Sequence, residues 1–410
     1  MANNKTEKKI RISIIGSGPS ALILAAELNS DIFDISIFEK NNAPSRKFLV
    51  AGKGGFNLTH SESPETFINK YSPLEFIKPF FKKFNNIDTR KWFEAIGIKT
   101  FTGTSKRVFP EKGIKPNQVL EAILQKLQHN KVKFYFDHKW IDFDKSFNLV
   151  FEQKKENIKI KSDIVIFALG GASWKITGSD GEWLELFKKH EIDTKDFAPS
   201  NCAVKINWNK DFIQKHVGKP VKNIAIYYND KYVKGEMVIT STGMEGGAIY
   251  AHAGNIREQL KNKPLARLFI DLKPSLDHEQ ILQKLDRTNK AKSLTKILIE
   301  NLKLTKAHVD LIKHFSPKGK FMDNKLLARI IKNLPIEISG LASLDEAIST
   351  VGGLSMEAID ENLKIKKLPF HYAIGEMLDW DAPTGGYLLQ ASFSMGFYLA
   401  HYLNKQALAI

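Results

Sequence analysis

The segment from Ile12 to Ala21 constrains the fold more than any other part of the chain. Its last six residues, Gly-Ser-Gly-Pro-Ser-Ala, fit the pattern G-x-G-x-x-G/A, in which the first glycine permits a tight turn and the second lets the backbone approach a pyrophosphate. An apolar run, 9–15, reads as a buried strand before the turn, and residues 20–30 have helical periodicity after it. A second strand, 34–38, ends in Glu39, where a carboxylate can accept hydrogen bonds from ribose hydroxyls. These features predict one half of a dinucleotide-binding fold.

The type of dinucleotide follows from the acid. A carboxylate at Glu39 favours a free ribose 2′-hydroxyl, as in FAD or NAD, over a 2′-phosphate. The adjacent Lys40, with its positive charge, would instead favour a 2′-phosphate. The alternative is an ordinary glycine turn with Glu39 on a solvated edge. The candidate cofactor-binding residues of this unit are Gly16, Gly18, Pro19, Ser20, Ala21, Glu39 and Lys40.

A second dense signal runs from Ser45 to His60. Arg46 and Lys47 place positive charge near the expected pyrophosphate, and a glycine-rich stretch lets the main chain pass close to a planar ring or a phosphate. A flexible lysine–glycine loop is the alternative. The candidates here are Arg46, Lys47, Gly52, Gly54, Gly55 and Asn57.

The chain closes with a matching glycine-rich segment, Tyr372–Asp379, followed by Thr384-Gly-Gly-Tyr387. We interpret it as the chain returning to the ligand bound by the first turn. Two ends that converge on one cofactor favour a flavoprotein over a simple nicotinamide dehydrogenase.

The pattern between these ends changes character twice. Residues 1–195 read as the first part of an FAD-binding domain, in which the apolar run 164–168 stops at Gly170-Gly171. Residues 196–345 read as an insertion: short alternating segments indicate a small antiparallel β-barrel, and 278–334 is helical. Residues 346–410 return to the first domain. The predicted fold is therefore α/β, a doubly wound Rossmann-like domain, discontinuous in sequence, with an inserted β-barrel and a helical subdomain.

Bulk properties exclude several classes of protein. The single cysteine, Cys202, rules out internal disulfides and multi-cysteine metal sites and suits a reducing cytoplasm, and the histidines show no metal-ligand spacing, so we predict no metal. No apolar run is long enough for a membrane span, and we expect a cytoplasmic protein. The net charge of +16 favours contact with polyanions such as RNA, but the lysines are scattered, as they are on ordinary solvated surfaces.

At this point the sequence resembles the BaiN/YhiN-type FAD-dependent oxidoreductases, often described as aminoacetone-oxidase-like flavoproteins. The resemblance covers essentially the whole chain, through the first turn, Arg46-Lys47, Arg107-Val-Phe-Pro110, Ala168-Leu-Gly-Gly171, Gly235–Thr240 and the closing segment. It implies FAD contacts from the candidates above and from Trp140 (by its main chain), Gly170, Gly171, Gly375, Glu376, Asp379, Gly385 and Gly386.

Those last residues have suitable chemistry for a flavin. Glu376 and Asp379 are acceptors for ribitol hydroxyls, and Gly385-Gly386 opens a helix whose N–H groups can face the pyrimidine edge, where reduction accumulates negative charge. Helix capping or a surface role is the alternative for both acids.

The sequence departs from the family at one informative position. Most members have an Arg-Cys pair before the asparagine aligned with Asn57, whereas this chain has Gly55-Phe56. Some members are thought to reduce a uridine of ribosomal RNA to dihydrouridine, which needs a proton donor that Phe56 cannot supply. Cys202 reads as a buried apolar residue rather than as a replacement acid.

We therefore expect an FAD-dependent oxidoreductase that transfers a hydride to or from an unidentified small-molecule substrate. An RNA-acting flavoprotein and a non-catalytic flavin- or NAD-binding module are the alternatives. No second G-x-G-x-x-G follows a strand, so NAD(P)H would have to dock transiently. Acid–base candidates are His60, Tyr387, Glu245 and His371, and Arg107 could hold an anionic substrate or pair with a carboxylate. The oligomeric state is not predicted.

Overall fold

The structure is a computed structural model that describes residues 8–50, 55–287, 293–316 and 323–408. The chain divides into two compact units. The first combines Met1–Ala198 with Ser349–Ile410, and the second is Pro199–Ile348. The first unit is therefore built from both ends of the chain, with the second unit inserted between them.

A five-stranded parallel sheet forms the centre of the first unit, in the order β20-β10-β1-β2-β6. Its central strands are apolar because both faces of a parallel sheet are buried. The alternation of strand and helix that produces it is the pattern predicted from the sequence. The strands are β1 (Ile10–Ile15), β2 (Phe33–Phe38), β6 (Lys133–Tyr135), β10 (Ile164–Phe167) and β20 (His371–Ala373).

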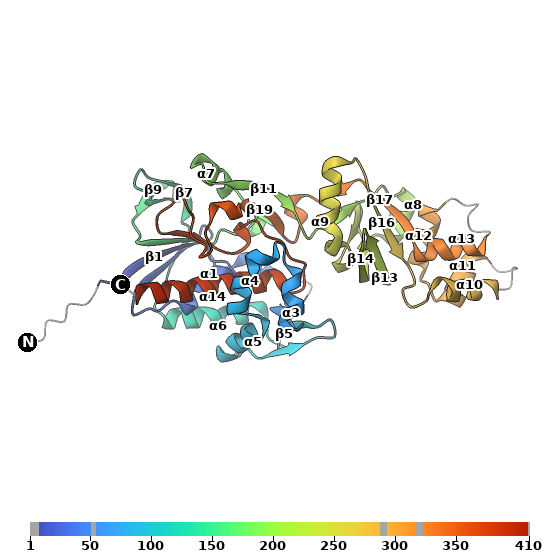
Figure 1. Cartoon of the computed structure of the whole chain (residues 1–410), viewed down its shortest axis with the longest axis horizontal. Coiled ribbons are helices and arrows are strands. Elements are labelled where there is room, and N and C mark those ends of the chain that lie inside the picture. Colours follow the sequence, from blue (N-terminus) through green and yellow to red (C-terminus); the bar gives the residue numbers. More distant parts are fainter. Residues whose placement is uncertain (1–7, 51–54, 288–292, 317–322, 409–410) are drawn as a thin grey trace, which may run out of the picture. The chain divides into compact units, whose positions relative to one another are not determined.

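Helices cover one face of this sheet, and a small antiparallel sheet packs against the other (Figure 1). Helix α1 (Pro19–Glu27) lies along the long closing helix α14 (Tyr387–Ala407), with α6 (Pro116–His129) beside them. The antiparallel sheet consists of β7 (Lys139–Phe143), β8 (Leu149–Gln153) and β9 (Glu156–Ile160). Its Trp140 ring lies 4.7 Å from the ring of Phe167 in β10, which anchors it to the parallel sheet.

The aromatic-rich excursion after the first mononucleotide unit packs on α14. Phe84 stacks on Phe397 at 4.3 Å, and Phe80 meets Tyr398 edge-on at 4.9 Å between ring centroids. The remaining elements of this unit are α2 (Arg46–Val50), β3 (Thr59–His60), α3 (Pro64–Phe67), η2 (Ile68–Lys70), α4 (Leu74–Lys83), α5 (Asn86–Ala95), β4 (Thr100–Thr102), β5 (Arg107–Pro110), η3 (Lys175–Thr177), α7 (Trp183–Lys189), β11 (Thr194–Pro199), β19 (Thr350–Leu354), η6 (Met356–Ala358) and η7 (Gly375–Met377).

The second unit is a seven-stranded antiparallel sheet in the order β17-β16-β13-β14-β15-β12-β18. The two edge strands, β17 (Leu334–Ile338) and β18 (Gly340–Leu341), are separated by Ser339 alone. Two residue steps span at most about 7 Å, so the sheet must curl until its edges meet, as in the predicted β-barrel. The other strands are β12 (Val204–Lys205), β13 (Pro220–Tyr228), β14 (Lys231–Ile239), β15 (Gly243–Glu245) and β16 (Ala266–Asp271).

The described residues of the part predicted to be helical, 278–334, form four short amphipathic helices. Their apolar residues join the strands in one hydrophobic core. The Lys332 ammonium group reaches down to the buried Asp271 carboxylate, at 2.6 Å, and so ties the last of these helices to the sheet. The helices of this unit are α8 (Lys210–His216), α9 (Gly247–Asn262), α10 (His278–Asp286), α11 (Leu294–Leu302), α12 (Lys306–Phe315), α13 (Asn324–Lys332) and η5 (Leu344–Glu346).

His252 of α9 predicts how this unit responds to acid. Burial lowers the pKa of its imidazole to about 4, and Nε2 donates to the Ile226 carbonyl oxygen at 3.2 Å. The unfolded chain therefore binds a proton that the folded chain does not, and stability falls as the pH drops from 6.5 to 4, by about 3 kcal/mol. Urea unfolding at several pH values should show this slope in the wild-type chain and a flatter one in His252→Gln. Identical slopes would contradict it.

Candidate functional site

The turn between β1 and α1 has the geometry of an anion-binding site. Gly16 has φ +96°, and a Cβ there would lie 2.5 Å from the Ala168 carbonyl oxygen, so only glycine fits. Gly18 is the N-cap of α1, without a capping side chain, and the first turn of the helix carries no acidic residue. The backbone N–H groups at this end are thus available to an anion, and the helix dipole favours one. This fits the pyrophosphate of a dinucleotide.

Glu39 lies at the end of β2, beside that turn, and is buried. One carboxylate oxygen accepts hydrogen bonds from the Ser17 backbone N–H at 3.1 Å and the Ser17 hydroxyl at 2.5 Å. The other accepts from the backbone and side-chain amides of Asn41, at 2.9 and 2.8 Å. The two side-chain donors are the exchangeable ones, so ribose hydroxyls could replace them while the backbone bonds hold the carboxylate in position.

Residues from three distant segments meet next to the first turn. The Lys47 ammonium group donates to the Ser173 hydroxyl at 2.8 Å and to the Glu376 carboxylate at 2.9 Å. Gly171, which follows β10, belongs to the same cluster. A Cβ on it would lie 2.3 Å from the Thr350 hydroxyl oxygen. The structure therefore brings together predicted candidates from four places in the sequence: the first turn, Lys47, Gly171 and Glu376.

Three other predicted residues, one acceptor and two cations, already have protein partners. Asp379 accepts from the Gly352 backbone N–H at 3.0 Å and pairs with Lys195 at 2.7 Å. Lys40 pairs with Asp180 at 2.6 Å, while Arg46 donates to the Asn41 side chain at 3.2 Å. Asp379 thus joins Gly352 to Lys195. Its predicted role as an acceptor for ribitol hydroxyls stays a prediction.

The closing glycines bring the start of α14 against β3. Gly386, the N-cap of α14, has φ +106°, and a Cβ there would lie 2.5 Å from the Thr59 carbonyl carbon. Gly375 makes a similar approach to the Ser20 hydroxyl of α1, at 2.6 Å from its virtual Cβ. The closing segment consequently touches both the first helix and the strand that carries His60.

Two of the acid–base candidates, His60 and Tyr387, are neighbours in this region. Their rings stack with centroids 5.2 Å apart, and the Tyr387 hydroxyl donates to a Glu62 carboxylate oxygen at 2.8 Å. Burial and the Glu62 carboxylate raise the pKa of Tyr387 far above its usual value, so it stays protonated. Burial lowers the pKa of His60 more than Glu62 raises it, which favours the neutral ring near pH 7.

Arg107 faces His60 across the β3–β5 pair. Its side chain lies over the closing glycines, with Nε 3.4 Å from where a Cβ of Gly385 would be. No carboxylate within the described segments forms an ion pair with it. The described residues therefore do not support the alternative that Arg107 simply pairs with a carboxylate.

The remaining candidates have other surroundings in the first unit or belong to the second unit. Trp140 is buried among Phe143, Phe167 and Phe187, His371 is buried with Nδ1 against the Pro369 carbonyl oxygen, and Glu245 belongs to β15 of the second unit. Gly55 is exposed, and Asn57 and Gly170 are half-buried. Cys202 is buried in a small cluster with Ala253, Ala342 and Ala347. Gly52 and Gly54 lie outside the described residues.

Sequence reasoning missed Glu62, Ser173 and Lys195. None stands in a motif, and each acquires its partner from a segment more than a hundred residues away. Phe56 stands where most members of the family have a cysteine. Its ring is buried and packs edge-on against Phe48 at 4.8 Å, so it supports the short helix α2.

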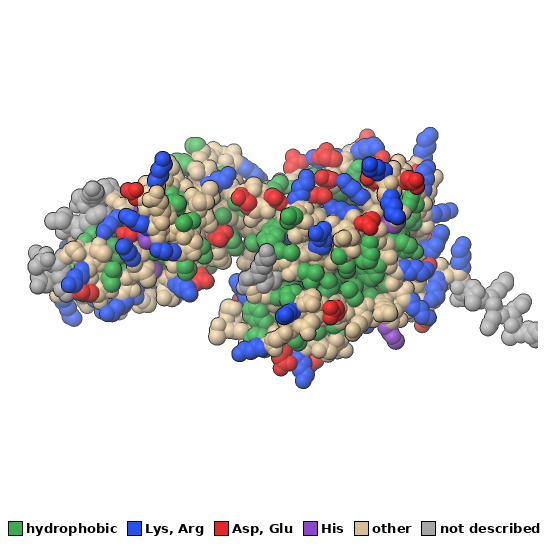
Figure 2. Space-filling model, turned by 180° about the vertical axis from the view of Figure 1, so that it is seen from behind, with side chains coloured by type: hydrophobic (Ala, Val, Ile, Leu, Met, Phe, Trp, Pro, Cys, Tyr) green, Lys and Arg blue, Asp and Glu red, His purple; other side chains and the backbone are tan. Residues whose placement is uncertain are grey.

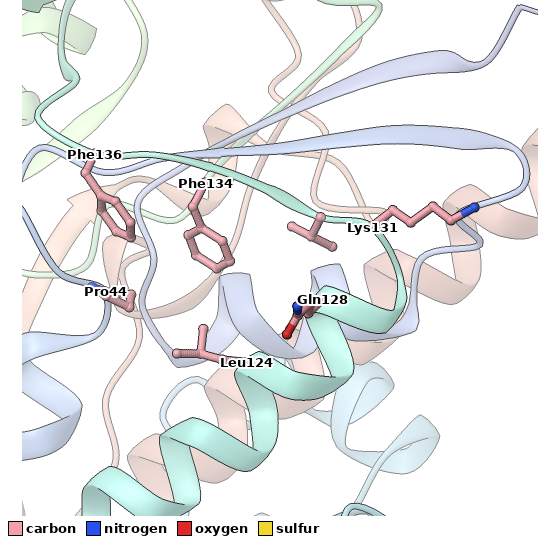
Figure 3. Close-up of a pocket in the computed structure, with 7 residues that line it drawn as sticks. Pro44, Leu124, Gln128, Lys131, Phe134 and Phe136 are labelled. Carbon is pink, nitrogen blue, oxygen red and sulfur yellow. The ribbon is translucent and has the colours of Figure 1, made fainter.

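A cavity of about 500 Å³ lies between α6 and the edge strand β6. In Figure 3 the rings of Phe134 and Phe136 and the side chains of Pro44 and Leu124 face one another across it. Among the described residues, its polar lining side chains are Gln128 and Lys131. Without an acid, a nucleophile or a phosphate-binding turn, it has none of the chemistry predicted for the candidate site.

The fold and the site define a dinucleotide-binding oxidoreductase of the Rossmann class. The chain belongs to the HI0933-like protein Rossmann domain family, whose model matches residues 10–402. This confirms the family resemblance and, with it, the predicted class of FAD-dependent oxidoreductase. Membership of the family leaves the substrate unidentified. Among the described residues, no helix is long and apolar enough to cross a membrane.

Relatives match over almost their whole length. The chain is 24% identical to a 3-dehydro-bile acid delta(4,6)-reductase from Clostridium scindens, covering 94% of this chain and 97% of the relative. It is 22% identical to a ribosomal RNA dihydrouridine synthase from Haemophilus influenzae, covering 96% and 98%. The solved 3-ketosteroid delta1-dehydrogenase from Sterolibacterium denitrificans has a TM-score of 0.50 and 11% identity, covering 96% and 99%. At this identity it supports the fold alone, and it agrees with the predicted α/β class.

Proposed function

We propose that this chain binds FAD at the carboxyl ends of its parallel strands and reduces a carbon–carbon double bond conjugated to a carbonyl group. One observation supports the proposal most strongly. The uncapped N-terminus of α1, the buried Glu39 and the Lys47–Glu376 pair all meet at one edge of the sheet. Ligands of open α/β sheets bind at this edge.

The residues of this edge suit the parts of the cofactor. The N–H groups that follow Gly18 would hold the pyrophosphate, and Glu39 would hold the adenosine ribose. Lys47, held between Ser173 and Glu376, would donate hydrogen bonds next to the phosphates, and the N-terminus of α14 would face the ring. Bound FAD supplies a reversible two-electron store that can deliver a hydride.

The type of substrate is inferred from two relatives with different substrates. One is named for reducing the 4,6 double bonds of a 3-dehydro-bile acid, and the other for making dihydrouridine. Both names imply that hydrogen is added across a double bond, and in both substrates a carbonyl group conjugated to that bond activates it. A small enone is therefore our first choice of substrate class, with NAD(P)H docking transiently as the electron donor in the cytoplasm.

The distribution of charge favours RNA as a second candidate substrate. The unit Pro199–Ile348 has 25 lysine and arginine residues against 15 acidic ones, so a net charge of +10 out of +16 lies in 150 of the 410 residues. Figure 2 shows basic side chains spread among acidic ones on the face that it displays rather than gathered in one stripe. A protein that neutralises several phosphates would lose RNA affinity steeply with salt. A shallow salt dependence would favour the small-molecule substrate.

Anaerobic turnover tests the proposal. The purified protein, loaded with FAD, is mixed with NADH or NADPH until its visible absorbance bleaches, and 2-cyclohexen-1-one or a uridine-containing RNA is then added. We expect one nicotinamide to bleach the flavin and an activated double bond to restore its colour, with the reduced product detected by mass spectrometry. A flavin that dithionite reduces but that neither class of acceptor reoxidises would contradict the proposed reaction.

A further inference from the structure

Arg107 is a half-buried cation without a counter-ion in the part of the chain that the structure describes. The comparable lysines of the same unit are neutralised: Lys40 by Asp180 at 2.6 Å and Lys47 by Glu376 at 2.9 Å. Leaving a guanidinium group unpaired in a partly buried position costs free energy unless a ligand supplies the missing acceptor.

The nearby acid, Glu62, is already engaged. One of its oxygens accepts the Tyr387 hydroxyl at 2.8 Å and lies 4.0 Å from Nδ1 of His60. Tyr387 is itself fixed, because its ring stacks on His60 and its carbonyl oxygen accepts from the Tyr71 hydroxyl at 2.9 Å. Arg107 also lies close enough to lower the pKa of both Tyr387 and His60, so the four groups share one electrostatic environment. Tyr387 therefore holds Glu62 in place, and Arg107 keeps its positive charge for another partner.

The position of Arg107 connects it to the candidate flavin site. Its side chain packs against Gly385, one residue before the N-cap of α14. The same closing segment carries Gly375 and Glu376, which contact the first helix and Lys47. A substrate bound at this end of α14 would meet the guanidinium group directly.

We propose that Arg107 binds the carbonyl oxygen of the substrate, and that Tyr387 is a positioning residue that keeps Glu62 from neutralising it. This rests on the proposed function. When a hydride adds to the far carbon of a conjugated double bond, the electron pair moves toward the carbonyl oxygen, which becomes an enolate until the other carbon takes a proton from solvent or an acid. Five N–H donors in a fixed fork stabilise that oxygen as its charge grows.

The test uses benzoate as the probe, because its planar conjugated carboxylate resembles an enolate in charge. Binding is followed in the FAD-loaded protein through the shift of the visible flavin bands. We expect Arg107→Gln to weaken benzoate binding about 10- to 100-fold, the size of one charge-assisted hydrogen-bonding contact. Arg107→Lys should recover part of the loss, and Lys112→Gln, which removes an exposed charge nearby in sequence, should change nothing.

A second pair of variants separates the role of Tyr387 from simple packing. Tyr387→Phe frees Glu62 to approach Arg107 and should weaken benzoate binding, whereas adding Glu62→Gln to it should restore binding. Equal affinities in wild type and Arg107→Gln, with equal FAD content, would overturn the inference. Loss of FAD from Arg107→Gln would do so too, by assigning Arg107 to the cofactor. A wild-type protein that never holds FAD would instead overturn the proposed function on which the inference rests.

Discussion

A Gly18→Asp variant is expected to fold normally and to bind FAD at least about 100-fold more weakly than the wild type, equivalent to about 2.7 kcal/mol. Gly18 has φ −71° and ψ 176°, a conformation open to any residue, and the nearest atom to its virtual Cβ is the Ala168 carbonyl oxygen at 4.0 Å. Aspartate is a favoured N-cap, so its carboxylate would accept hydrogen bonds from the first N–H groups of α1. Those are the groups proposed to hold the pyrophosphate, and the new negative charge would also repel it.

The matched control is Gly18→Ser, which caps the same helix without charge. It should lose less FAD affinity than Gly18→Asp, because it adds no negative charge, and both variants should match or exceed the thermal stability of the wild-type apoprotein, because a capping side chain in place of glycine contributes a few tenths of a kcal/mol. Affinity is measured by titrating apoprotein with FAD and following the quenching of flavin fluorescence. Unchanged FAD binding by Gly18→Asp would show that the cofactor does not use this helix end.

The second large effect is expected at the crossing of α1 and α14. A Cβ on Gly396 would lie 2.3 Å from the Ser20 carbonyl oxygen and 3.2 Å from the Leu24 backbone nitrogen. Gly396→Leu would force the two helices apart and should cost about 3 kcal/mol or more. For a unit of this size the melting temperature should fall by roughly 6–12 °C.

An exposed position on the same helix provides the control for Gly396→Leu. Gln406→Leu adds a similar side chain on the solvent side and should change the stability by less than about 0.5 kcal/mol. Urea unfolding of both variants, followed by circular dichroism, measures the difference. A Gly396→Leu variant as stable as the Gln406→Leu variant would mean that α1 and α14 do not pack as closely as described.

The parts of the fold that depend on local pattern were predictable. The strand, turn and helix around Gly16 and Gly18 follow from residue types whose conformational limits act within a few positions, and the structure has β1, α1 and β2 where the apolar runs predict them. The helical part of the insertion was predictable for the same reason, since its apolar residues recur at helical spacing.

The contacts within the candidate site could not be predicted in the same way. Glu62 and Tyr387 are 325 residues apart, and Lys47 and Glu376 are 329 apart, so only the folded sheet brings them together. Asp379 illustrates the converse, because its chemistry suits a ribitol hydroxyl but Lys195 and Gly352 already bind it. A carboxylate in a motif reveals what it can accept, whereas its partner is decided by tertiary structure.

The most direct test of the account is an absorption spectrum of the purified protein, followed by chromatography of the cofactor released on denaturation. We expect the two visible bands of oxidised flavin, and FAD as the released species, in the wild type and in Arg107→Gln but not in Gly18→Asp. A colourless wild-type protein that takes up no added FAD would contradict the assignment of this sheet edge to a flavin. The turn from Gly16 to Ala21 would then have to serve another nucleotide.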